Sequence, residues 1–92
     1  MSSTIVITGV TRGLGRALAE QFSLMGHTVI GCGRNKDILN NLSKSLQENT
    51  DFKALDISDY DMVRSWAKEI LKKFDVPDFL INNAAVINKN AN

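Results

Sequence analysis

The sequence has one cysteine and one histidine, and their scarcity excludes some classes of protein. Cys32 alone cannot form an internal disulfide, which excludes a small fold held by disulfides. No cluster of cysteine, histidine and acidic residues with metal-ligand spacing surrounds it, so we expect no metal site. We expect Cys32 to be a small core residue of a strand rather than a reactive thiol, and His27 to be a turn residue rather than a catalytic base.

The sequence also lacks long apolar runs and an excess of charge of either sign. No apolar segment is long enough to span a bilayer, and no basic region followed by an apolar run marks a secretory signal. The net charge is +1, with acidic and basic residues mixed along the chain, so neither nucleic acid nor a membrane is expected as a partner. We predict a single cytoplasmic domain over residues 1–92, without repeats or low-complexity segments.

What the sequence does contain is a regular alternation of short apolar runs and amphipathic segments. Strands are predicted at Thr4–Thr8, Thr28–Cys32, Phe52–Leu55 and Asp78–Asn82. Helices are predicted over about residues 13–25, over about 36–48, and from a capping box formed by Ser58 and Asp61 to about Phe74. This alternation predicts an α/β fold, a three-layer doubly wound parallel sheet truncated to four strands in the order 3-2-1-4. The first two helices should cover one face of the sheet and the third helix the other. The third helix should bury an apolar stripe made of Met62, Val63, Trp66, Ile70 and Phe74.

A glycine-rich stretch, Thr8-Gly9-Val10-Thr11-Arg12-Gly13-Leu14-Gly15, joins the first strand to the first helix. Glycines permit a sharp turn and the close approach of a ligand, and a helix N-terminus offers unpaired N–H groups to an anion. An ordinary strand-to-helix connection is the alternative, but the strand before and the helix after this stretch favour dinucleotide binding. We therefore assign contacts with the cofactor to Gly9, Thr11, Arg12, Gly13, Leu14 and Gly15.

The residues at the end of the second strand should select the cofactor. Sites for NAD usually carry Asp or Glu there, to bind the 2′-hydroxyl of the adenosine ribose. Here Gly33 is followed by Arg34 and Asn35, and an arginine suits a 2′-phosphate because its planar group binds phosphate oxygens in pairs. Arg12 can approach the same phosphate from the other side. Either arginine alone is equally consistent with a solvated surface charge, but the two together predict NADP(H) rather than NAD(H).

Two further segments follow strands and should reach the same crevice, since parallel strands end at one edge of a sheet. Asp56 can accept a hydrogen bond from the adenine amino group, with the backbone of Ile57 beside it, or can help cap the third helix; both interpretations stay open. Asn82 and Asn83 should tie the strand end to neighbouring backbone, because an unsatisfied buried amide is costly. The backbone from Asn82 to Ala84 should line the ribose pocket. Gly31-Cys32-Gly33 is not taken as a second nucleotide motif, because it lacks a third glycine.

Together these segments resemble the short-chain dehydrogenase/reductase family. Thr8-Gly9-x-x-x-Gly13-x-Gly15 matches its cofactor motif, Asp56 its adenine-contacting aspartate, and Asn82-Asn83-Ala84 the start of its Asn-Asn-Ala-Gly motif, whose last glycine is Ala85 here. Arg12 and Arg34 match the pattern of members that prefer NADP(H). The resemblance implies reversible hydride transfer between NADP(H) and a carbonyl or alcohol substrate.

The catalytic residues of that family are a serine and a Tyr-x-x-x-Lys pair. The single tyrosine here is Tyr60, and Arg64 stands where the lysine would follow, so no catalytic residue is assigned. We expect the N-terminal NADP(H)-binding portion of a short-chain dehydrogenase/reductase, inactive by itself. A non-catalytic stand-alone nucleotide-binding or interaction module is the alternative. The fourth strand, left at the edge of the sheet with an uncovered face, should promote self-association.

Overall fold

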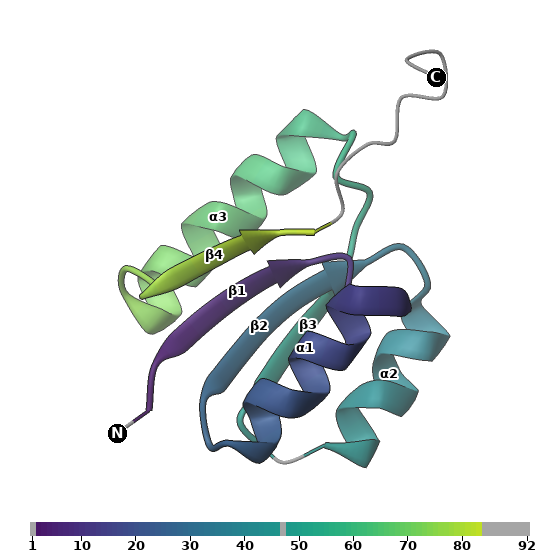
Figure 1. The fold of residues 1–92 in the computed structure, drawn as a ribbon. Coiled ribbons are helices and arrows are strands. Elements are labelled where there is room, and N and C mark those ends of the chain that lie inside the picture. The colour runs from purple at the N-terminus through teal and green to yellow at the C-terminus, as the bar shows by residue number, and fades with distance from the viewer. Residues whose placement is uncertain (1, 47, 84–92) are drawn as a thin grey trace, which may run out of the picture.

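The computed structural model describes residues 2–46 and 48–83, which form one sheet with helices on both faces (Figure 1). The predicted Ala84 lies outside the described residues. All strand pairings are parallel, in the order β3-β2-β1-β4, as predicted. The elements in chain order are β1 (Thr4–Thr8), α1 (Gly13–Leu24), β2 (Thr28–Gly33), α2 (Lys36–Ser45), β3 (Thr50–Ala54), α3 (Tyr60–Phe74) and β4 (Phe79–Asn82).

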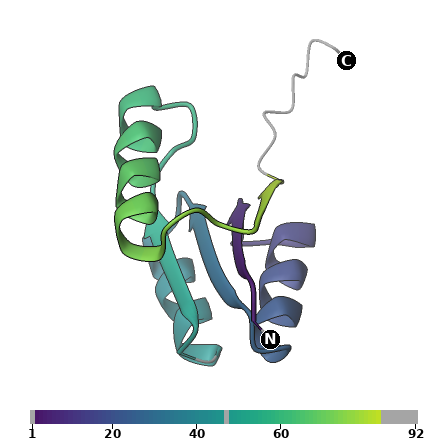
Figure 2. The same cartoon turned by 90° about the vertical axis from the view of Figure 1, so that its left-hand side faces the viewer.

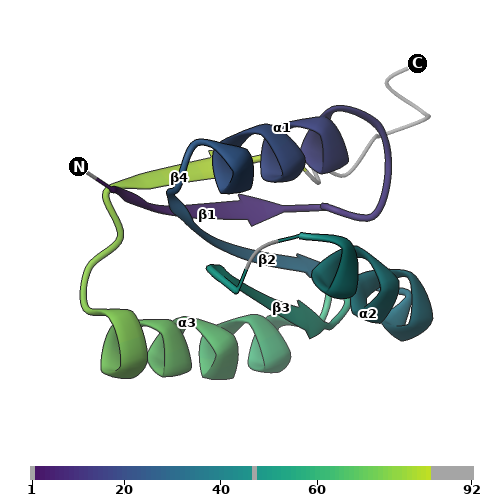
Figure 3. The same ribbon diagram turned by 90° about the horizontal axis from the view of Figure 1, so that it is seen from below.

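The helices divide between the two faces of the sheet as predicted. Helices α1 and α2 cover one face and α3 lies alone on the other (Figures 2 and 3). Successive residues of β1 alternate between these faces, so that Ile5 and Ile7 pack towards α1 and α2 while Val6 packs towards α3. The apolar core is therefore split by the sheet into two layers, which explains why the consecutive residues Ile5, Val6 and Ile7 are all apolar and buried.

Some bounds of the predicted elements are wrong. Helix α2 ends at Ser45 and not near Glu48, because the Ser45 hydroxyl donates to the Leu42 carbonyl at 2.8 Å and Leu46 is already extended. Strand β3 correspondingly begins at Thr50, two residues before the predicted start, and includes Ala54 but not Leu55.

The predicted capping box at the start of the third helix is also wrong. The N-cap of α3 is Asp59, whose Oδ1 accepts the N–H of Met62 at 3.2 Å, while Ser58 binds Asp56 instead. Met62 was expected in the core but is 41% exposed. The first turn of α3 extends beyond the strand ends in Figure 1, so less of the sheet lies beneath it. Trp66 and Ile70, further along α3, are buried as predicted.

His27 and Cys32 have structural surroundings, as expected. The Nδ1 atom of His27 accepts the backbone N–H of Ser3 at 3.0 Å. This bond lies where β1 and β2 begin, at the end of the sheet opposite the glycine-rich loop. Cys32 is fully buried between the sheet and α3, and burial raises the pKa of its thiol. Among residues 2–46 and 48–83, no group of three or more His, Cys, Asp or Glu side chains is placed to hold a metal ion. None of the helices in this part of the chain is long and apolar enough to cross a membrane.

Candidate functional site

The loop between β1 and α1 is fastened to the neighbouring strand β2. The N–H groups of Gly9 and Val10 both donate to the carbonyl oxygen of Cys32, at 2.9 and 3.1 Å. Val10 is fully buried against the sheet. Gly9 and Gly13 have φ of +74° and +63°, a region that residues with a Cβ rarely adopt, so the turn requires glycine at both positions.

The loop leads into a helix N-terminus that has no side-chain cap. Arg12 is the N-cap of α1, has an extended backbone and makes no capping hydrogen bond among the residues that the structure describes, and no acidic residue lies in the first turn. A Cβ built on Gly13 would meet no atom within 4 Å, so the space beside the first turn is open. The uncapped N–H groups and the positive end of the helix dipole therefore face a space that an anion can enter.

Gly15 brings the loop, the helix and the end of β4 into direct contact. A Cβ at this position would collide with the carbonyl oxygen of Gly9 and with the side-chain nitrogen of Asn83. That nitrogen donates to the Gly9 carbonyl at 2.9 Å, and the Thr8 hydroxyl donates to Oδ1 of Asn82 at 3.0 Å. The prediction that these asparagines tie the strand end to neighbouring backbone is confirmed for Asn83 and wrong for Asn82, which binds the Thr8 side chain.

Arg34, Asn35 and Asp56 follow the carboxyl ends of β2 and β3, at the same end of the sheet as the glycine-rich loop. The register pairs Thr8 with Cys32 and Asn82, and Gly33 with Ala54, so all strand ends that precede the predicted segments are neighbours. Asn35 has a second use that the sequence analysis did not identify, since its Oδ1 caps α2 by accepting the Ile38 N–H at 3.0 Å. Its position after a strand and three residues before an apolar helix residue is the signal that was available.

Asp56 is held in place by Ser58. Its Oδ1 accepts the backbone N–H of Ser58 at 2.9 Å and the Ser58 hydroxyl at 2.8 Å. These bonds, the backbone one first, hold the pKa of the Asp56 carboxyl below its usual value, and the positive charge of Arg34 lowers the pKa further. Ile57 follows Asp56 and packs against the core beneath α3. Asp56 is therefore ionised at neutral pH and supports the turn before α3, and no described residue binds its Oδ2.

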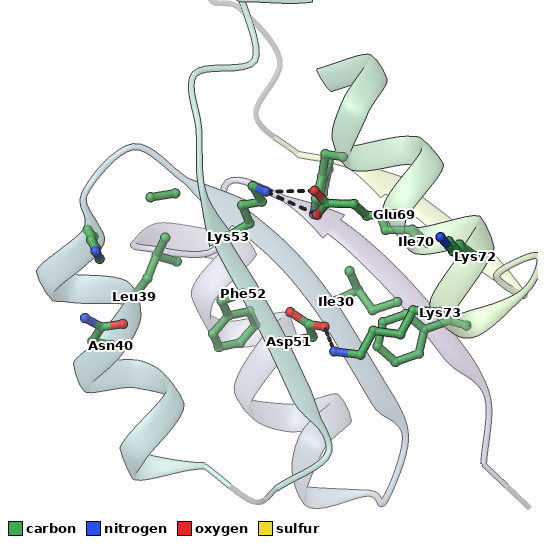
Figure 4. A pocket seen from close by; sticks show the side chains of 14 residues that line it. Ile30, Leu39, Asn40, Asp51, Phe52, Lys53, Glu69, Ile70, Lys72 and Lys73 are labelled. Carbon is green, nitrogen blue, oxygen red and sulfur yellow. Dashed lines mark hydrogen bonds and ion pairs between the residues drawn. The ribbon is translucent and has the colours of Figure 1, made fainter. Parts of the chain in front are cut away.

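Two grooves flank α3 and differ in character. The groove on the β3 side, of about 850 Å³, is crossed by ion pairs that join Lys53 to Glu69 at 3.1 Å and Lys73 to Asp51 at 2.9 Å (Figure 4). The groove on the β4 side, of about 430 Å³, runs along Leu71 and Leu80, both of which are more than half exposed. Charged side chains thus span the groove on one flank of α3, while the exposed side chains Leu71 and Leu80 along the other flank are apolar.

The chain matches the family model described as short chain dehydrogenase over residues 3–92. It is 44% identical over 90 residues to the NADPH-dependent pterin aldehyde reductase of Arabidopsis thaliana, an alignment that covers 96% of this chain and 37% of that protein. Among solved structures, a short chain dehydrogenase from Bacillus anthracis is similar with a TM-score of 0.83 and 29% identity, covering 90% of this chain and 34% of that one. The L-sorbose reductase of Gluconobacter frateurii, solved with NADPH and L-sorbose, gives a TM-score of 0.82 and 30% identity over 90% of this chain and 33% of that one. The chain spans about a third of the length of these relatives.

Proposed function

The chain belongs to the short-chain dehydrogenase/reductase family, and from this premise we propose that it binds the adenosine half of NADP(H). When bound, the cofactor exchanges a hydride with a carbonyl or alcohol substrate, which is the oxidoreductase chemistry proposed for the whole protein. The observation that carries the proposal is the open, uncapped N-terminus of α1 at Gly13, with Arg12 directly before it. A phosphate group is an anion that such a helix end binds, and glycine-rich loops before helices bind the pyrophosphate of dinucleotides in this way.

The remaining predicted residues have separate roles around this helix end. Gly9, Leu14 and Gly15 complete the loop around the phosphates, with Thr11 beside them. Asp56 accepts the adenine amino group through its Oδ2, and the backbone of Ile57 lies next to the base. We propose that the backbone of Asn82 and of Ala84 binds the ribose. Asn35 contributes through its position at the start of α2.

Arg12 and Arg34 are proposed to bind the 2′-phosphate and so to favour NADP(H) over NAD(H). Both residues are exposed. Arg12 lies in the loop before α1, and Arg34 directly follows β2. The strand register supports this assignment, because Gly33 pairs with Ala54, so that Arg34 and Asp56 both follow neighbouring strand ends. An arginine there binds phosphate oxygens with paired hydrogen bonds.

Isothermal titration with two adenosine probes tests the proposal on the chain itself. We expect 2′,5′-ADP, which carries the 2′-phosphate, to bind at least tenfold more tightly than 5′-AMP, a difference of about 1.4 kcal/mol. Arg34→Met should remove most of this preference. Arg64→Met, which changes an exposed arginine on α3, is the matched control and should leave the preference intact. Equal binding of both probes would contradict NADP(H) selection, and no binding of either would contradict the proposed function.

The chain is not proposed to catalyse hydride transfer by itself. Among the described residues the only tyrosine is Tyr60, which is 72% exposed, and the guanidinium of Arg64 lies 5.6 Å from the centre of its ring. Position 64 thus lacks the lysine of the family's Tyr-x-x-x-Lys pair, and no catalytic role is proposed for Tyr60. An NADPH-consumption assay with ketones and aldehydes should therefore give no turnover, and turnover would contradict this part of the proposal.

We further propose that the isolated chain self-associates through the β4 side of α3 and the free edge of β4. Phe79 and Leu80 project to opposite faces of β4, and they are 58% and 68% exposed. A strand of a parallel sheet is normally covered on both faces, and an open strand edge pairs readily with another chain. The contrast with the β3 flank, which two ion pairs span, supports the β4 flank as the surface involved.

A further inference from the structure

The glycine-rich loop rests on two glycines of β2 that no nucleotide motif explains. Gly31 and Gly33 are two residues apart, so their bare positions lie on the same face of the strand. A Cβ at Gly31 would lie 2.7 Å from Cγ1 of Val10, and a Cβ at Gly33 would lie 2.6 Å from Cγ2 of Thr11. Carbon atoms in contact are normally about 3.5–4.0 Å apart. The side chains of Val10 and Thr11 therefore occupy the space that side chains at positions 31 and 33 would need.

Glycine is required at position 33 by the lack of space for a side chain and not by the conformation of the backbone. Its backbone is not among those with positive φ, so any residue is able to adopt this conformation. The obstacle is Thr11, whose Cβ would also lie 3.6 Å from the new atom, while Cδ2 of Leu39 would close the other side at 3.5 Å.

Thr11 has little freedom to move aside. It is half-buried and branched at Cβ, and it follows Val10, which is fully buried and bound through its N–H to the Cys32 carbonyl. Relief of the contact would require a new rotamer of Thr11 or a shift of the loop that forms the phosphate site.

We propose that Thr11 and Gly33 form a steric pair that determines cofactor choice, an inference that rests on the proposed function. An NAD site needs a carboxylate at the end of the second strand, and a carboxylate side chain at position 33 must start with the Cβ that Thr11 excludes. Because position 33 has no side chain, the next residue, Arg34, recognises the adenosine ribose. Arg34 does so by binding a 2′-phosphate on that ribose. Thr11 is in this sense a specificity-determining residue, because it excludes the carboxylate side chain that an NAD site would need at position 33.

The steric part of the proposal is tested without any cofactor. Urea unfolding is measured for the wild-type chain, Gly33→Ala, Thr11→Gly and the double variant. We expect Gly33→Ala to lower the unfolding midpoint clearly, and to lower it by less than half as much in the Thr11→Gly background. Thr28→Gly, which changes a threonine at the other end of β2, is the control background and should leave the effect of Gly33→Ala unchanged. Equal effects of Gly33→Ala in all three backgrounds would overturn the steric pair.

The specificity part is tested by titration of NADPH and NADH into Gly33→Asp and into the double variant Thr11→Gly/Gly33→Asp. Gly33→Asp alone should lose stability without gaining NADH affinity. The double variant should reduce the ratio of NADPH to NADH affinity at least tenfold. An NADH preference from Gly33→Asp alone, at unchanged stability, would overturn the inference, as would an unchanged ratio in the double variant. If the wild-type chain binds neither nucleotide, the proposed function fails, and the unfolding experiment still decides whether the two positions exclude each other.

Discussion

The side-chain nitrogen of Asn83 donates a hydrogen bond of 2.9 Å to the carbonyl oxygen of Gly9, a residue 74 positions earlier in the chain. The bond joins the end of β4 to the loop before α1, and Gly15 lies against both partners. The shape of the proposed phosphate site thus depends on the last described residue as well as on the first turn.

Replacing Asn83 with alanine should destabilise the fold by about 1 kcal/mol, because the Gly9 carbonyl loses its side-chain donor. Asn83→Asp should be more harmful at neutral pH, since a carboxylate would then face the carbonyl oxygen. Urea unfolding monitored by Trp66 fluorescence measures both changes. Asn41→Ala, at an exposed position of α2, is the control and should change the unfolding free energy by no more than about 0.5 kcal/mol. An effect of Asn83→Ala no larger than this control would contradict the role of the bond.

Gly15→Ala and Gly13→Ala should differ although both glycines belong to the first turn of α1. At Gly15 the added methyl group overlaps backbone and the Asn83 amide, so we expect a loss of about 3 kcal/mol or failure to fold. At Gly13 the methyl group meets no atom, and the cost comes from the positive φ alone, about 1 kcal/mol. Thermal unfolding followed by circular dichroism compares the two variants. Equal melting temperatures would show that Gly15 is not in tight contact.

The low pKa of Asp56 predicts a pH-dependent contribution to stability. Because the carboxyl group has a lower pKa in the folded than in the unfolded chain, its contribution is present above the unfolded value of about 3.9. It is lost as the pH falls through the folded pKa. Asp56→Asn should therefore be less stable than wild type at pH 7, and the difference should shrink as the pH falls below about 4.

Ser58→Ala provides a direct check on the cause of that shift. It removes the hydroxyl donor and leaves the backbone donor, so the pKa of Asp56 should rise towards its usual value without reaching it. Titration of the carboxyl carbon of Asp56 by NMR measures this change. Identical titration curves for Ser58→Ala and wild type would assign the low pKa to other groups.

Self-association through the β4 flank predicts that Leu80→Lys lowers the apparent molecular mass in solution. A charged side chain on that surface opposes the burial on which the association depends. Leu24→Lys is the matched control, because Leu24 on α1 is 67% exposed and Leu80 is 68% exposed. Size-exclusion chromatography with light scattering over a range of concentrations compares the three proteins. A wild-type chain that is monomeric throughout, or equal effects of both substitutions, would contradict the proposal.

The arrangement of strands and helices was predictable because it depends on apolar periodicity, and the parallel order follows from the alternation of the two kinds of element. The site was predictable as a set of strand ends for the same reason. The packing of Thr11 on Gly33 was not, because the sequence gives two glycines in a strand without indicating what lies on them. The choice between Ser58 and Asp59 as helix cap was also missed, because the capping-box pattern does not show that Ser58 binds Asp56 instead. The cytoplasmic location, the single domain and the cofactor contacts stay predictions.

The parallel sheet also has a consequence for the order of folding. Residues paired between β1 and β2 are 24 positions apart, whereas those paired between β1 and β4 are 74 apart. Closing the longer loop costs more chain entropy and slows the formation of contacts that depend on it. The part from β1 to β3, whose paired residues are 24 and 21 positions apart, is therefore expected to assemble first, and β4 to join it last. Folding should accordingly finish, not begin, at the phosphate loop, when Asn83 arrives to bind Gly9.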